Sequence, residues 1–124
     1  MAEIGDELKR LIEENPLALA TVDEKGNLHC IAVAFVKFVS ENQILITDNY
    51  MTKTRENILR NPNVALVVWN KDWEENCVGY ELKGVAEYFT EGEWYEKAKQ
   101  IPENEGEPCK GVVLVTLVGT KKLA

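Results

Sequence analysis

The sequence predicts a mainly β protein, a six-stranded antiparallel barrel with short flanking helices. Three observations support this fold class. Apolar and polar residues alternate along most of the apolar segments, as in strands that bury one face. Short polar turns connect consecutive strands, and the segments with helical spacing are short. This order of elements favours a closed or nearly closed antiparallel barrel over a parallel sheet with long crossovers.

Length and composition indicate one domain over residues 1–124. A chain of 124 residues with 45% hydrophobic composition can bury one core without disulfides or a structural metal. The three cysteines and the single histidine are too widely spaced for a zinc site or a disulfide framework, so we expect no metal. Cys30 lies in an apolar run and is expected to be buried.

The formal net charge of −7 argues against nucleic acid as a partner, because nucleic-acid binders carry a basic surface. The same charge does not exclude a small anionic ligand, since a lysine at a helix start reverses the potential locally. No segment approaches the roughly 18 uninterrupted apolar residues that a membrane span needs. We therefore expect a cytoplasmic protein that does not associate with membranes.

The first predicted elements are a helix and a long hairpin. Apolar residues at helical spacing predict a helix over residues 4–14, which Pro16 ends. A hairpin is predicted over residues 17–38, with Gly26 supplying the positive φ of its turn. Its second arm, Leu28–Phe38, is mostly apolar on both alternating faces. We expect one face to pack inside the barrel and the other against a helix, a second subunit or a ligand.

The rest of the chain consists of strands and two more helices, separated by polar loops. The predicted strands cover residues 43–47, 64–69, 79–89 and 111–118, and the predicted helices cover about residues 54–61 and 92–100. The strand over residues 79–89 alternates apolar with charged residues, so one of its faces is expected to contact water.

A candidate anion site lies where the polar loop after the strand of residues 43–47 leads into a helix. The first turn of a helix has unpaired N–H groups and a partial positive charge, which stabilise a phosphate. Lys53 adds a full charge there, and Thr52 or Thr54 adds a hydroxyl donor. Capping of the helix by Thr52 is the alternative. It explains the threonines, but it does not explain a cation in the first turn.

Four segments occur in a recognisable order: Ala18–Val22 before a glycine-containing hairpin, the helix start Lys53-Thr54-x-x-Asn57, the strand start Asn61–Ala65 and the strand Lys83–Ala86. Together they resemble the flavin-binding split barrel of the pyridoxamine 5′-phosphate oxidase-like superfamily. The resemblance covers about residues 5–119. In length the chain is most similar to the small bacterial FMN-binding proteins and the related general-stress flavin proteins of that superfamily.

The resemblance implies that FMN binds in the cleft of a homodimer. In that family the residues matching Lys53 and Thr54 grip the phosphate. The residues expected near the isoalloxazine are Thr47, Asp48 and Asn49 at its polar edge, and Ala32, Val33 and Ala34 along the ring and ribityl chain. The small alanines leave room for a flat ligand, although a tight barrel interior explains them equally well. A dimer also agrees with the two-sided apolar runs at residues 28–38 and 112–118.

We expect an FMN-binding flavoprotein that acts in redox chemistry or electron transfer, as a flavin reductase or a similar oxidoreductase. The cofactor carries that chemistry, and His29, expected at an exposed strand position, forms no nucleophile–base pair, so no catalytic residue is assigned. Val112–Ala124 lacks the arginine and histidine of a true pyridoxamine 5′-phosphate oxidase, which disfavours that reaction. The alternative is a non-catalytic dimeric binding module for a flavin-like cofactor or haem.

Overall fold

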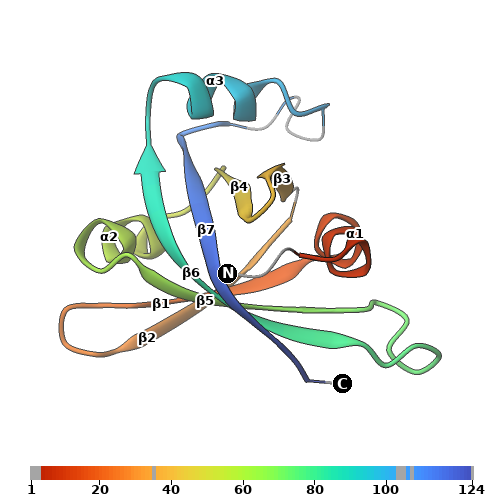
Figure 1. Ribbon diagram of the computed structural model, residues 1–124. Coiled ribbons are helices and arrows are strands. Elements are labelled where there is room, and N and C mark those ends of the chain that lie inside the picture. Colours follow the sequence, from red (N-terminus) through yellow and green to blue (C-terminus); the bar gives the residue numbers. More distant parts are fainter. Residues whose placement is uncertain (1–3, 35, 103–105, 107, 124) are drawn as a thin grey trace.

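The computed structural model describes residues 4–34, 36–102, 106 and 108–123. Within this part of the chain, one seven-stranded antiparallel sheet is flanked by three helices (Figure 1). The strands are β1 (Leu17–Val22), β2 (Leu28–Val33), β3 (Lys37–Ser40), β4 (Gln43–Asp48), β5 (Asn63–Trp69), β6 (Gly79–Phe89) and β7 (Gly111–Lys122). The helices are α1 (Asp6–Glu14), α2 (Lys53–Arg60) and α3 (Glu93–Lys99).

The sheet curls into a barrel that stays open at one place. Its strand order is β2-β1-β5-β6-β7-β4-β3, so its two edge strands, β2 and β3, follow one another in the chain. β2 pairs with β1, and β3 pairs with β4 only over Gln43–Leu45. The opening between β2 and the C-terminal half of β4 is the split of the barrel. The predicted split-barrel fold is therefore confirmed.

The prediction of one strand over residues 28–38 was wrong, and it explains why seven strands are present where six were expected. In β2 the odd-numbered face turns inward, ending at the buried Val33, whereas the next buried side chain is the even-numbered Val36. A strand with a period of two cannot bury both positions on one face. The chain leaves the sheet after Val33 and begins β3 at Lys37, on the opposite edge.

The core lies inside the barrel, with a second apolar layer under α3. On β7, Val113, Val115 and Leu117 are fully buried in the barrel interior, whereas Val112 and Leu114 belong to the cluster that packs with Ala98 of α3. Over residues 112–115 both faces of this strand are therefore covered within one chain, which removes these residues from the expected dimer surface. Val118 is 57% exposed.

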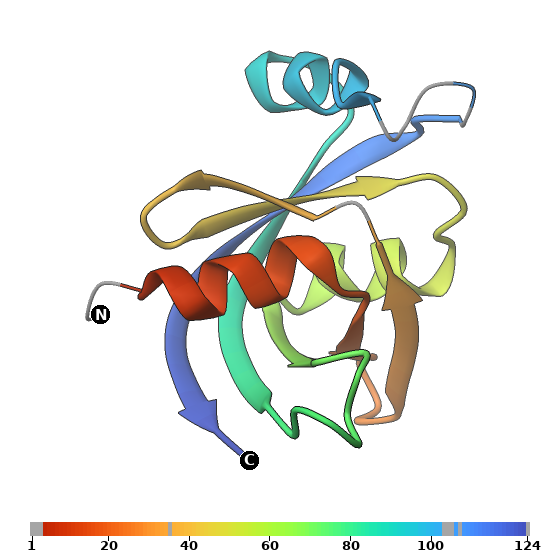
Figure 2. The same cartoon turned by 90° about the vertical axis from the view of Figure 1, so that its right-hand side faces the viewer.

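The three helices lie at separate places around the sheet, as Figure 2 shows from a second direction. α1 buries Leu8, Leu11 and Ile12 against the core, and its Glu13 carboxylate accepts a hydrogen bond of 2.9 Å from the N–H of Phe38 in β3. This contact covers part of one sheet edge, which exposed backbone would otherwise leave open to pairing. No described helix is long and apolar enough to cross a membrane.

The outer face of β2 is uncovered in the single chain. Leu28 is 84% exposed, and Cys30 and Ala32 on the same face are also exposed. The prediction that Cys30 is a buried small hydrophobe was therefore wrong. The alternation of residues along β2 indicated two apolar faces correctly, but no described part of the chain packs over the outer one.

Candidate functional site

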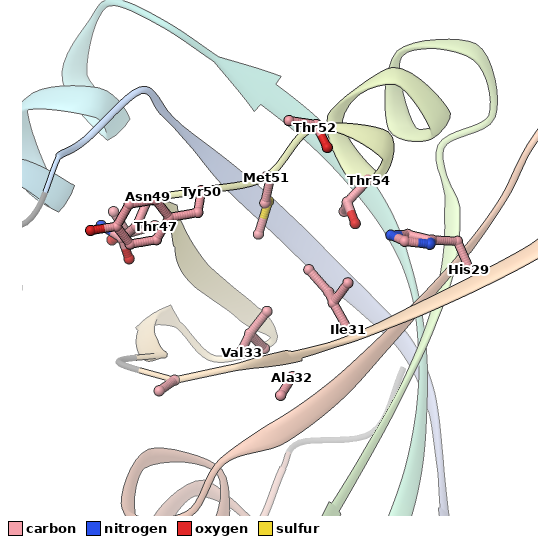
Figure 3. Close-up of a pocket in the computed structure, with 11 residues that line it drawn as sticks. His29, Ile31, Ala32, Val33, Thr47, Asn49, Tyr50, Met51, Thr52 and Thr54 are labelled. Carbon is pink, nitrogen blue, oxygen red and sulfur yellow. The ribbon is translucent and has the colours of Figure 1, made fainter.

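A cavity of about 390 Å³ lies in the split of the barrel. Its volume falls in the range of about 300–1,000 Å³ that is usual for small-molecule sites. Two parts of the chain form its walls, β2 with the residue after it and the segment from the end of β4 to the start of α2. The lining residues are His29, Ile31, Ala32, Val33, Ala34, Thr47, Asn49, Tyr50, Met51, Thr52 and Thr54 (Figure 3).

One wall is an edge strand whose inward side chains alternate. His29, Ile31 and Val33 share the inner face of β2, as the period of two requires. Figure 3 shows these three side chains extending from the strand toward the opposite wall. Ala32 and Ala34 also line the cavity, and as small residues they add little bulk to this wall.

The opposite wall is the loop that joins β4 to α2. Thr47, near the end of β4, is the first residue of this wall and is 5% exposed. The N–H of Met51 donates a hydrogen bond of 2.7 Å to the Asp48 carboxylate, which bends the chain immediately after β4. Met51 thereby faces Ile31 across the cavity (Figure 3).

The start of α2 forms one end of the cavity. Thr52 is the N-cap residue, but its side chain makes no capping hydrogen bond, so capping does not account for this threonine. Thr54 lines the cavity and is 1% exposed. One turn later, the Asn57 Nδ2 donates a hydrogen bond of 3.0 Å to the Thr21 Oγ1 in β1, which fixes the helix against the sheet.

Polar groups lie at both ends of the cavity, with apolar side chains between them. His29, Thr52 and Thr54 gather at the α2 end, and Thr47 and Asn49 lie at the other end (Figure 3). Ile31, Val33 and Met51 occupy the middle. This arrangement suits an elongated ligand with a flat apolar body and polar groups at both ends.

Asp48 lines no part of the cavity, although it was expected at the edge of the flavin ring. Its side chain is fully buried behind the wall and accepts hydrogen bonds from the Met51 N–H and, at 2.5 Å, from the Tyr88 hydroxyl. The Lys110 Nζ lies 3.9 Å from its carboxylate. Burial of the phenol raises the pKa of Tyr88 above its usual range. The hydrogen bond to Asp48 and the negative charge of Asp48 raise this pKa further.

Lys53 also lies outside the cavity lining. It is the first residue of α2 and is exposed, between the two lining threonines. The hydrogen bonds from Asn27 lower the pKa of Asp23 most, and the positive charge of Lys53 lowers it by a smaller amount. The Lys53 side chain therefore lies within electrostatic reach of the β1–β2 turn. The other predicted site residues do line the cavity: Ala32, Val33, Ala34, Thr47, Asn49, Thr52 and Thr54.

Four lining residues were not predicted as site residues: His29, Ile31, Tyr50 and Met51. His29 was expected to be exposed, but it is half-buried and turns into the cavity. The signal for two of them was present, because residues 29, 31 and 33 share one face of a strand and Val33 was a predicted site residue. Within the described residues, no group of three or more His, Cys, Asp or Glu side chains is placed to hold a metal ion.

Sequence comparison places this chain beside known proteins over most of its length. The model of a family described as pyridoxamine 5′-phosphate oxidase matches residues 4–120. An uncharacterized protein of Methanocaldococcus jannaschii is 34% identical over 104 residues, which are 82% of this chain and 66% of that protein. The chain thus spans slightly less than two thirds of the length of this relative.

Solved structures share the fold across nearly the whole chain. HupZ from Group A Streptococcus is 28% identical and superposes with a TM-score of 0.87, covering 97% of this chain and 94% of HupZ. An FMN-binding protein from Syntrophomonas wolfei is 18% identical, with a TM-score of 0.82 over 94% of this chain and 83% of that protein. At this lower identity the likeness concerns the fold.

Proposed function

We propose that this chain, which belongs to the pyridoxamine 5′-phosphate oxidase family across residues 4–120, is a flavoprotein. It binds FMN in the cavity beside β2 and acts in electron transfer. The observation that carries the proposal is the order of groups along the cavity, polar at the α2 end, apolar in the middle and polar again at the end of β4. FMN has a comparable order, a phosphate and the hydroxyl-bearing ribityl chain at one end, then the apolar faces of the ring, then the polar ring edge.

The phosphate belongs at the α2 end. Thr52 and Thr54 both line the cavity there, and the first N–H groups of α2 carry the partial positive charge that favours an anion. Lys53 lies between the two threonines and adds a full positive charge from the exposed side. Charge-assisted hydrogen bonds of this kind are about twice as strong as neutral ones.

The isoalloxazine ring belongs between β2 and the loop after β4. Ile31, Val33 and Met51 supply apolar contact, and Ala32 and Ala34 keep this wall thin. In this position the polar edge of the ring meets Thr47, Asn49 and the backbone at Asp48. These residues bind and orient the cofactor and exclude water from it.

FMN, when bound, supplies the electron-transfer chemistry, and the protein supplies position and electrostatics. We therefore propose a flavin reductase or a similar oxidoreductase.

A homodimer completes the proposal. The cavity wall at β2 is a sheet edge, and its outer face exposes Leu28, Cys30 and Ala32. Edge strands with exposed apolar residues favour pairing with another chain. A second copy seated against this face places its own surface beside the cavity and shields the flavin from water.

Titration of FMN into the protein tests the site, with absorbance and flavin fluorescence as readouts. We expect saturable binding by the wild type, and a dissociation constant raised about tenfold or more in Thr54→Val and in Lys53→Ala, because each loses a partner of a charged phosphate. Lys121→Ala is the matched control, since Lys121 is also exposed but lies near the end of β7. Absence of FMN binding by the wild type contradicts the proposal.

One observation favours haem as a second candidate ligand. The imidazole of His29 turns into the cavity, and a single histidine is a common axial ligand of haem iron. The same titration with hemin separates the two ligands. Uptake of hemin but not FMN, with a haem absorbance band that shifts in His29→Ala, identifies the protein as a haem-binding module.

A further inference from the structure

Behind the cavity wall, two segments about sixty residues apart in the chain are joined by hydrogen bonds. The Nδ2 of Asn49 donates to the carbonyl of Pro108 at 2.7 Å. The backbone N–H of Lys110 donates to the carbonyl of Asp48 at 2.9 Å, and its Nζ donates to the carbonyl of Met51 at 2.5 Å. The loop that lines the cavity is therefore held at three residues, Asp48, Asn49 and Met51.

The buried carboxylate of Asp48 lies at the centre of this contact. Its Oδ1 accepts the N–H of Met51, its Oδ2 accepts the hydroxyl of Tyr88, and the Nζ of Lys110 lies 3.9 Å from Oδ1. A fully buried charge is costly unless hydrogen bonds and an opposite charge compensate it. The conformation of the loop and the burial of Asp48 therefore depend on one another.

Tyr88 connects this contact to the rest of the fold. It lies on β6, and the space over Gly111 at the start of β7 is filled by its phenol ring, so that a Cβ at Gly111 would collide with it. Its hydroxyl also donates to Asp48, so the loop before α2 and the start of β7 are joined through one phenol.

We propose that Asp48, Tyr88 and the Pro108–Lys110 segment form a clamp that holds the Asn49–Thr52 wall of the cavity in the shape that binds its ligand. None of the clamp side chains of Asp48, Tyr88 and Lys110 lines the cavity. They are positioning residues, because they act on the ligand through Asn49 and Met51. The part of the proposal that concerns FMN affinity rests on the proposed function, whereas the part that concerns the wall does not.

Substitutions at two members of the clamp test it without touching the cavity. Tyr88→Phe removes the hydroxyl that Asp48 accepts, and Lys110→Met removes the donor to the Met51 carbonyl. Lys110→Arg keeps a cationic donor and serves as the conservative rescue. Tyr80→Phe is the matched control, because Tyr80 lies on β6 like Tyr88 but at the other end of the strand, opposite Lys122 of β7.

The first readout is amide hydrogen exchange at Met51 in the protein without FMN, measured by NMR. The Met51 N–H donates directly to Asp48, so its exchange reports the state of the clamp. We expect exchange about 3–10 times faster in Tyr88→Phe and Lys110→Met, the change that follows from one lost hydrogen bond. Lys110→Arg and Tyr80→Phe are expected to exchange at Met51 like the wild type.

The second readout is the dissociation constant for FMN, which we expect to rise about 3–10-fold in Tyr88→Phe and Lys110→Met and to stay unchanged in Tyr80→Phe. Unchanged exchange at Met51 in both variants overturns the clamp. Faster exchange with unchanged FMN affinity overturns the positioning role. If the wild type binds no FMN, the proposed function fails, and the exchange readout still decides whether the clamp holds the wall.

Discussion

Asp48 shows how far the role of a residue depends on its partners. The resemblance to the flavin-binding split barrels implied that it meets the polar edge of the ring, but its side chain turns away from the cavity into the protein. Met51, Tyr88 and Lys110 supply the donors and the charge that compensate its burial. The same carboxylate accepts the N–H that bends the loop after β4 and, after burial of the ring, raises the pKa of Tyr88.

The ionisation of Tyr88 predicts a specific loss of stability at high pH. Its pKa is raised by burial and by Asp48, so the unfolded chain deprotonates first as the pH passes the usual value of about 10. The contribution of Tyr88 is complete below that pH and decreases as the pH rises toward the raised pKa. Linkage limits the slope to about 1.4 kcal/mol per pH unit for one proton, and partial exposure of the ring reduces it.

Urea denaturation between pH 8 and 11 measures this effect. We expect the free energy of unfolding to fall more steeply above pH 10 in the wild type than in Tyr88→Phe, which has no phenol to ionise at this position. Tyr95→Phe retains Tyr88 and should follow the wild type. Parallel curves for wild type and Tyr88→Phe would show that Tyr88 ionises alike in both states.

At the scale of elements, the pairing of β6 with β7 depends on a glycine. The register shifts between Lys83 and Gly84, and a Cβ on Gly84 would lie 2.5 Å from Val115 Cγ1 and 2.8 Å from the carbonyl oxygen of Thr116. The second of these contacts is with backbone, which cannot move aside without disturbing the ladder. Gly84 therefore lets two strands approach more closely than a side chain permits.

Gly84→Ala is expected to destabilise the protein by about 1–3 kcal/mol, the usual range for overpacking. Gly119→Ala on β7 is the control, since a Cβ there meets no atom within 4 Å. Thermal and urea denaturation compare the two variants with the wild type. Equal stability of Gly84→Ala and Gly119→Ala would mean that the strands separate at little cost.

Element prediction succeeded where burial has one period throughout a segment. β6 spans Gly79–Phe89 as predicted, because its buried and exposed residues alternate over most of its length. α2 begins at Lys53, one residue before the predicted start, which is within the usual variation of helix ends. The prediction for residues 28–38 was wrong, because the buried side chains change from odd-numbered to even-numbered positions between Val33 and Val36. Sequence alternation alone does not reveal that change.

At the scale of the whole molecule, the exposed outer face of β2 predicts where two copies meet. Leu28 is the most exposed of the large apolar side chains described, at 84%. Burial of a leucine stabilises by about 1.5–3 kcal/mol. Leu28→Lys should therefore weaken the proposed dimer about tenfold or more. It should also weaken the proposed binding of FMN, because in that dimer the second copy would shield the cavity.

Sedimentation velocity at micromolar concentrations measures this change. Leu123→Lys is the control, because Leu123 is 54% exposed and lies beside Trp69 and Trp73, away from β2. A wild type that is monomeric at these concentrations contradicts the dimer. A dimer that Leu123→Lys disrupts while Leu28→Lys does not would place the interface at the tryptophan-lined surface instead.

The sequence by itself determined the mainly antiparallel barrel, the order of its elements and most of the cavity wall. Periodicity reports which residues share a face, and hairpin spacing reports which strands are neighbours. Both signals are local, and they survive in any fold that keeps the same pairing. The assignment of Val33, Thr47 and Thr54 to one site came from the resemblance to the flavin-binding split barrels.

Only the tertiary structure decided what covers each face and where the polar side chains turn. In the folded chain, the segment after Leu28 forms strands at two different sheet edges. His29 lines the cavity, whereas Asp48 is buried away from it, and α3 packs over part of β7. These outcomes depend on contacts between residues that lie 40 to 60 positions apart, such as Asp48 with Tyr88 and Met51 with Lys110. Local periodicity carries no information about such contacts, because burial and charge compensation are settled by the neighbours that folding brings together.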